Sequence, residues 1–282
     1  AGSGGPDAIL VIAAAPHPGA PQADALLTDR RQAFERGLAA LERLTSGPLL
    51  MTHDRRERIS PGGRIRPIAV EAATSGALPG TIIDRFVPVT GGRRVWQIGA
   101  QDVARIGDAL ETGLVPFERV VAIAGAGTAA SRLLRMVEGA EILPSIGDAR
   151  PKAGGRVLAG PAIGGAASRF LPARCNQITI LPGPRRADEP DRPRWHVPTR
   201  RPLRAAPLIP HAALDGLLGP DVPALPLLRA LSVGDAEEAR RLGALALLEE
   251  DIAPLTWASG GTEDFGALLR STLDTLARED RP

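Results

Sequence analysis

The sequence predicts an α/β protein with an α/β domain over residues 6–116, a small β-rich domain over 117–183 and a helical region over 225–282. In the first part, apolar runs of strand length alternate with apolar residues at helical spacing. In the second part, short segments alternate with glycine-rich turns, and in the third, leucines recur three and four residues apart. With 282 residues, 44% of them hydrophobic, the chain can bury sizeable cores.

The first part has a repeating strand–helix pattern. Residues 8–12 form an apolar run between Pro6 and Pro16, which is typical of a buried strand. Apolar residues at helical spacing predict an amphipathic helix over 30–46, which Gly47 and Pro48 end. The alternation continues and predicts a three-layer α/β arrangement. The remaining predicted elements are strands at 49–51, 68–70 and 95–98, and a helix through Val103, Ile106 and Leu110 that ends at Gly113.

The rest of the chain has a different composition and a different pattern of apolar residues. Residues 184–224 are rich in proline and arginine and lack periodicity, so we expect an extended connection there. Asp235 is a predicted N-cap, and the apolar residues that follow it at helical spacing predict one helix up to Leu248. A final helix is predicted around Leu268–Leu276, and residues 1–5 have the composition of a linker or tag.

Composition excludes several classes of site. Cys175 is the only cysteine, so neither an intrachain disulfide nor a cysteine-ligated iron–sulfur cluster can form within this chain. The four histidines are widely separated, and we predict no metal site. The chain has no tyrosine and few other aromatic residues, which argues against nucleic-acid binding by base stacking. No apolar run is long enough to predict a transmembrane segment.

The segment after the apolar run 120–124 invites two interpretations. Gly125-Ala126-Gly127-Thr128-Ala129-Ala130 fits the dinucleotide fingerprint, which makes Gly125 and Gly127 weak candidates for cofactor binding. The fingerprint also requires a helix next and an acidic residue at the end of a second strand. Because Pro144 interrupts the place of that strand, a glycine turn between β-strands is the favoured alternative.

We predict no catalytic residues. The carboxylates at 249–251 and near Asp235 are interpreted as helix caps or a solvated face rather than an acid–base pair. Cys175 is interpreted as a small buried thiol. After the first strand, prolines at 16, 18 and 21 remove N–H donors that a phosphate cradle would need.

Arginines are concentrated in the predicted connection. Two interpretations stay open, a set of solvated loop side chains and a surface that docks on an acidic partner or on anionic lipid headgroups. We predict partner binding by these residues: Arg185, Arg186, Arg192, Arg194, Arg200, Arg201 and Arg204.

Five collinear segments resemble the A subunit (NqrA) of the sodium-translocating NADH:quinone reductase. Residues 95–103 resemble the family's "VWHIGYQDV", residues 117–125 its "VERVVSLAGP", and residues 174–181 its "RYHNQVSVI". Residues 76–81, and 227–235 together with 242–251, supply the other two matches. The order and the rough spacing agree with the family over most of the chain.

The resemblance implies a Rossmann-like domain, then an SLBB domain (a β-grasp module) and a helical region, and it assigns Gly125–Gly127 to an SLBB turn. It also implies a peripheral, cytoplasmic place on the inner face of the bacterial cell membrane, with membrane subunits as partners. The family's complex passes electrons from NADH to ubiquinone and pumps sodium. Its FMN, FAD, iron–sulfur centre and ubiquinone are expected on partner subunits, and no cofactor is expected in this chain.

The chain also departs from the family. No part of the sequence resembles the family's N-terminal barrel-like domain, so we expect either a fragment or a short paralogue. A "CPGK" segment is replaced by residues 258–261, and the subunit-contact stretch is barely recognisable in 207–224. Our first hypothesis is an NqrA-like component that supports electron transfer without a redox centre and is not catalytic when isolated. The alternatives are a scaffold paralogue in another electron-transfer complex and an autonomous flavin- or dinucleotide-binding oxidoreductase.

Overall fold

The computed structural model forms two compact units, Ala1–Gly183 and Pro184–Pro282, and we describe each by itself. Within them, the structure describes residues 5–55, 62–71, 77–88, 93–128, 131–151, 154–162, 164–182, 214, 217–218, 222–258 and 264–279. None of the helices in that part of the chain combines the length and apolar character needed to cross a bilayer.

The first unit begins with a four-stranded sheet in the order β3-β2-β1-β4, in which all recorded pairings are parallel. We call it the parallel sheet. The two central strands of this sheet are almost entirely buried, as strands covered on both faces are. The strands are β1 (Ala8–Ile12), β2 (Leu49–Asp54), β3 (Ile65–Val70) and β4 (Val95–Gly99). Its helices are α1 (Ala23–Leu27), α2 (Arg31–Leu44), α3 (Pro79–Phe86) and α4 (Ala100–Thr112).

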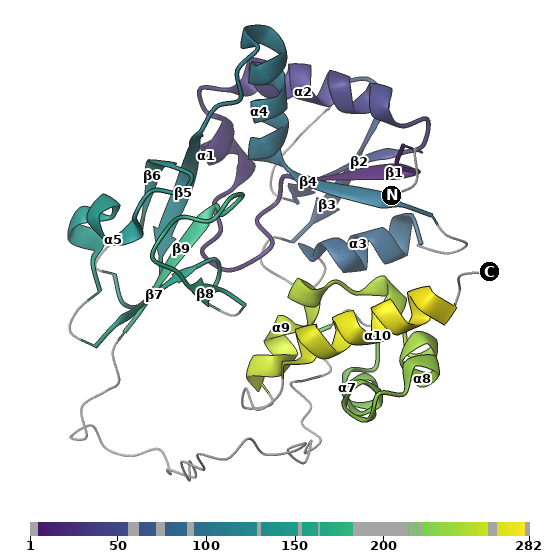
Figure 1. The fold of residues 1–282 in the computed structure, drawn as a ribbon. Helices are drawn as coiled ribbons and strands as arrows, with labels where there is room; N and C mark the ends of the chain where they lie inside the picture. The colour runs from purple at the N-terminus through teal and green to yellow at the C-terminus, as the bar shows by residue number, and fades with distance from the viewer. Residues whose placement is uncertain are drawn as a thin grey trace. The chain divides into compact units, whose positions relative to one another are not determined.

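Alternate residues of these strands enter two separate apolar cores. Ile9 and Val11 pack in a core with residues of α1, α2 and α4, whereas Leu10 packs in a second core with Ile82 and Ile83 of α3. Figure 1 shows α2 and α4 on one side of the parallel sheet and α3 on the other. The α/β fold class is thereby confirmed, as are the predicted helices at α2 and α4.

Helices α2 and α4 cross closely because each has a glycine at the contact. A Cβ atom on Gly37 would lie 2.0 Å from the Val103 carbonyl oxygen, and one on Gly107 would lie 1.8 Å from that of Ala33. Any larger residue would force the helices apart. Helix α4 ends at Gly113, whose φ of +73° forms the left-handed cap that its place in the sequence predicts.

A second, mixed sheet follows in the order β6-β5-β9-β7-β8. Strand β5 pairs in parallel with β9 and antiparallel with β6, and β7 joins β9 to β8 in antiparallel pairings. Val121, Ile123, Ile178 and Ile180 are completely buried in its core, beneath Ile142 of α5. The elements are β5 (Glu118–Ala124), β6 (Arg132–Val137), α5 (Ile142–Ser145), η2 (Gly147–Ala149), β7 (Arg156–Ala159), β8 (Ala166–Ala167) and β9 (Gln177–Leu181).

The second unit is helical and has its own leucine-rich core. Asp235 is the predicted N-cap, since its carboxylate accepts a hydrogen bond from the Glu238 amide at 2.9 Å. The single helix predicted from there to Leu248 is wrong, because Gly243 adopts a φ of +97° and breaks it. The elements are α7 (Ala224–Val233), α8 (Ala236–Arg241), η3 (Ala244–Ala246), α9 (Glu249–Ala258) and α10 (Phe265–Glu279), the last of which confirms the predicted final helix.

Candidate functional site

Three of the segments that resemble the family meet at one place in the first unit. Gln101 and Asp102 begin helix α4, Arg119 lies in β5, and Asn176 directly precedes β9. Their side chains connect α4, which packs on the parallel sheet, to the mixed sheet. We call Asp102, Arg105, Arg119, Glu138 and Asn176 together the charge network.

Arg119 is the centre of the charge network, and its side chain is fully buried. Its Nη1 atom lies 2.6 Å from an Asp102 oxygen and 2.9 Å from a Glu138 oxygen. Its Nε and Nη2 atoms donate to the Asn176 side-chain oxygen at 3.2 and 2.6 Å. A buried guanidinium is tolerated only when its charge and its donors are matched in this way.

Arg105 links the charge network to the chain that follows α4. It forms two hydrogen bonds with Glu138, at 2.8 and 3.1 Å, and donates to the Pro116 carbonyl oxygen from Nε at 3.0 Å and from Nη2 at 2.7 Å. Burial by itself would raise the pKa of Glu138. Hydrogen bonds from Arg105, the Arg174 amide and Arg119 outweigh burial and lower that pKa from 4.5 to about 2.

Gln101 adds a neutral connection beside the charges, and it is completely buried. Its amide nitrogen donates to the Val120 carbonyl at 3.1 Å and to Asn176 at 3.0 Å, while its oxygen accepts from the Val120 amide at 2.6 Å. The side chain therefore bonds to β5 as a neighbouring strand would. The whole arrangement fixes the relative position of the two sheets.

The strand order of the parallel sheet points to another location, the carboxyl ends of β1 and β4, where Rossmann-like folds bind ligands. Here the Ala13 and Ala14 amides donate to the Thr52 hydroxyl oxygen at 3.0 and 3.1 Å, and the Ala15 amide donates to Gln22 at 3.2 Å. The amides that could cradle a phosphate are thus bound to side chains of the protein itself.

The loop that follows β1 also packs on the mixed sheet. The Gln177 side chain donates to the Pro18 carbonyl oxygen at 3.1 Å. A Cβ atom on Gly19 would lie 3.0 Å from the Ala124 Cβ atom. The edge where a dinucleotide would bind in a Rossmann-like fold therefore serves as an internal contact between the two sheets.

Gly125 and Gly127 directly follow β5, and the next element after them is a strand, β6, instead of the helix that the dinucleotide fingerprint requires. Gly125 has a φ of +113°, and a Cβ atom there would lie 2.3 Å from the Ile180 carbonyl oxygen. The Gly127 amide donates to that same oxygen at 2.8 Å. Close packing on β9 therefore accounts for both glycines. The seven arginines predicted to bind a partner lie outside the described residues.

The other predicted groups are dispersed. Burial raises the pKa of the half-buried Cys175 thiol, which donates to the Gln177 carbonyl oxygen at 3.0 Å. Asp251 is buried and accepts a hydrogen bond from the Leu248 amide at the start of α9, whereas Glu249 pairs with Arg270. Across the described residues, no three His, Cys, Asp or Glu side chains gather as metal ligands would.

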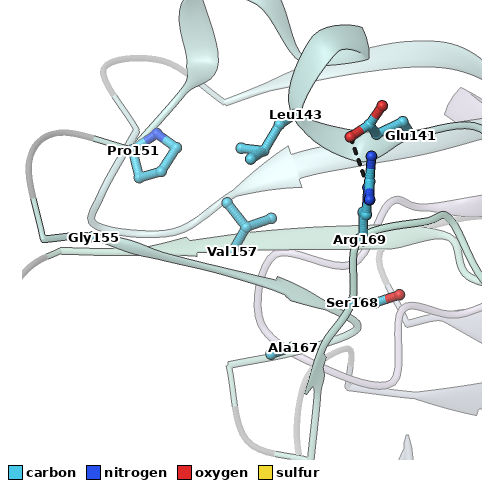
Figure 2. Close-up of a pocket in the computed structure, with 8 residues that line it drawn as sticks. All are labelled: Glu141, Leu143, Pro151, Gly155, Val157, Ala167, Ser168 and Arg169. Atoms are coloured by element: carbon cyan, nitrogen blue, oxygen red, sulfur yellow. Dashed lines mark hydrogen bonds and ion pairs between the residues drawn. The ribbon is translucent and has the colours of Figure 1, made fainter.

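A shallow groove of about 400 Å³ lies on the mixed-sheet part of the first unit (Figure 2). Leu143, Pro151 and Val157 supply its apolar wall. Its charged groups satisfy one another, since Arg169 and Glu141 form an ion pair at 2.9 Å. The arrangement offers no nucleophile beside a base, and so it does not suggest catalysis.

The sequence did not single out the charge network as a site. Arg105 and Glu138 belong to no sequence motif, and they pair with each other although they lie 33 positions apart in the chain. The available signal was indirect: Asp102, Arg119 and Asn176 all lie in the segments on which the family resemblance rests.

Two of the comparisons with known proteins point to one family. Residues 3–115 match the family described as NqrA second alpha/beta domain. The A subunit of the Na(+)-translocating NADH-quinone reductase from Teredinibacter turnerae is 30% identical over 97% of this chain and 67% of its own length. Its counterpart from Rhodopirellula baltica is 32% identical over 97% of this chain and 66% of its own length.

A chain in the crystal structure of NAD+-reducing [NiFe]-hydrogenase in the H2-reduced state is 13% identical, with a TM-score of 0.46 over 95% of this chain and 54% of that one. A likeness at that level says nothing of function. The sequence relatives, by contrast, share nearly the whole of this chain, which spans about two thirds of their length. The chain belongs to the NqrA family, the A subunits of the Na(+)-translocating NADH-quinone reductase.

Proposed function

We propose that the chain is a peripheral, cytoplasmic component of a Na+-translocating NADH:quinone reductase, bound to the complex's membrane subunits, and that it supports electron transfer without a redox centre of its own. The observation that carries the proposal is the closed carboxyl edge of the parallel sheet. The Thr52 hydroxyl and the Gln22 side chain accept the hydrogen bonds of the three amides after β1. A phosphate would have to compete with both groups.

In this proposal FMN, FAD, the iron–sulfur centre and ubiquinone belong to partner subunits. Cys175 cannot ligate a cluster alone, and its raised pKa keeps the thiol protonated near neutral pH. The mixed sheet, with the short helix α5 against its core, is proposed to be an SLBB-type β-grasp module. That assignment also gives the turn at Gly125 and Gly127 a purely structural role.

The test is purification of the tagged full chain from solubilised membranes of its host, followed by mass spectrometry. Recovery of flavin-bearing or quinone-reducing membrane subunits is expected. Recovery of soluble enzymes alone would favour the paralogue hypothesis, and recovery of nothing would defeat the proposal. Absorbance of the isolated chain near about 450 nm tests the autonomous oxidoreductase, since stoichiometric bound flavin would favour it.

A further inference from the structure

Figure 1 shows the connection that leads from α4 to β5. Several large apolar side chains of this connection are exposed. Leu114 is 75% exposed and Phe117 is 72% exposed. Val115 between them and Leu110 on the last turn of α4 are both more than half exposed. We call residues 113–117 the apolar loop. A cluster of this kind is uncommon on a monomer and marks an interaction surface.

The backbone of the apolar loop is held in place. Two donors of Arg105 bind the Pro116 carbonyl oxygen, and the Leu114 amide donates to the Thr112 hydroxyl oxygen at 3.2 Å. The Phe117 carbonyl oxygen accepts from the Glu138 amide at 3.1 Å. A loop fixed before binding loses little conformational entropy when a partner covers it.

Strand β6 extends the apolar surface. Val137 pairs with Glu118, the residue after Phe117, and its side chain is about half exposed. Phe117 thus follows Leu114 and Val115 in the apolar loop and precedes the strand residue that pairs with Val137. Exposed rigid aromatic side chains are enriched at the energetic centres of protein interfaces.

The charged residues beside the apolar loop indicate which kind of partner would bind there. Glu111 is partly neutralised by Arg36, but exposed Glu118 forms no ion pair within the described part of the chain. An uncompensated carboxylate disfavours an anionic lipid surface, and it would repel its own copy if this surface formed the centre of a symmetric dimer. It favours a protein that places a cation beside an apolar pocket.

We propose that Leu110, Leu114, Val115, Phe117 and Val137 form a docking surface for another subunit of the same complex, with Phe117 entering an apolar pocket and Glu118 facing an arginine or lysine. This inference rests on the proposed function. The partner is defined by that chemistry, an apolar pocket with a basic rim.

The experiment places the photo-crosslinker p-benzoylphenylalanine at position 117 of the full chain, expressed in its host with the other subunits of the complex. The matched control places it at position 170, because Phe170 is another exposed phenylalanine of the first unit, at 50% exposure. After irradiation, the complex is purified and the cross-linked peptides are identified by mass spectrometry.

Position 117 is expected to cross-link to an apolar segment of a partner subunit beside an arginine or lysine, at a yield well above that of position 170. Phe117→Ala should weaken retention of the chain about thirtyfold. Glu118→Lys should weaken it about tenfold. Both positions are exposed, so neither change should impair folding.

Four results would overturn the proposal: equal yields from the two positions, cross-links only to lipid, cross-links only to a second copy, or no cross-link within an intact complex. In each of these cases the chain would still purify with its membrane subunits, so the proposed function would stand. A chain that joins no complex would overturn both.

Discussion

Replacing Arg119 by methionine tests whether the charge network joins the two sheets. The substitution keeps an unbranched side chain of similar length but removes the buried charge and its hydrogen bonds to Asp102, Glu138 and Asn176. Removing one partner of a buried ion pair lowers the free energy of unfolding by about 3–5 kcal/mol. Because Arg105 still neutralises Glu138 in this variant, we expect a loss of folding free energy near the lower end of that range.

The assay is urea and thermal unfolding of the full chain, followed by circular dichroism. A loss of about 3–5 kcal/mol lowers the melting temperature of a unit this size by about 6–20 °C. The matched control is Arg135→Met in the neighbouring strand, where the arginine is 54% exposed and pairs with Asp29 at 2.5 Å. It should cost no more than about 1 kcal/mol. Equal losses from the two variants would refute the reasoning.

The difference between wild type and Arg119→Met should also depend on pH. The folded-state pKa of Glu138 is about 2, below the ordinary value of 4.5, so its ionised form stabilises the folded state. That contribution is complete above pH 4.5 and is lost as the pH falls from 4.5 towards 2. The stability gap between the two proteins should therefore narrow across this window, and a constant gap would show that Glu138 is not coupled to Arg119.

Three further predictions concern packing and accessibility. Gly107→Ala should destabilise the first unit by more than about 2 kcal/mol, because its Cβ would lie 1.8 Å from the Ala33 carbonyl oxygen; Gly62→Ala, with open space around it, should be neutral in the same denaturation assay. Thr52→Val should cost about 2 kcal/mol by leaving two buried amides unpaired, whereas Thr52→Ser should restore most of the loss. Cys175 should react with iodoacetamide much more slowly in the folded chain than in urea at pH 8, since burial raises its thiol pKa.

The local elements of the first unit were predictable because their signals are local. The run at Ala8–Ile12 and the helical spacing at Arg31–Leu44 each predict one element, and each is found there. The break at Gly243 was missed because leucine spacing continues across it while the backbone requires a left-handed residue. A periodic pattern alone does not distinguish one helix from two helices that share a core.

The charge network could not be predicted in the same way, because its energy depends on three-dimensional neighbours. Arg119 looks like a surface residue in sequence, since arginine is rarely fully buried. Only the approach of α4, β5 and β9 supplies the partners that make its burial tolerable. The family resemblance located these segments but did not assign them a shared role.

Arg105 connects the charge network to the proposed docking surface. One part of its guanidinium pairs with Glu138 inside the charge network, and another binds the Pro116 carbonyl oxygen in the apolar loop. The position of Phe117 is therefore set by the same interactions that hold the two sheets together. In the proposed role the chain contributes through the precision with which it presents a surface, and the rigidity of that surface originates in a buried ion-pair network.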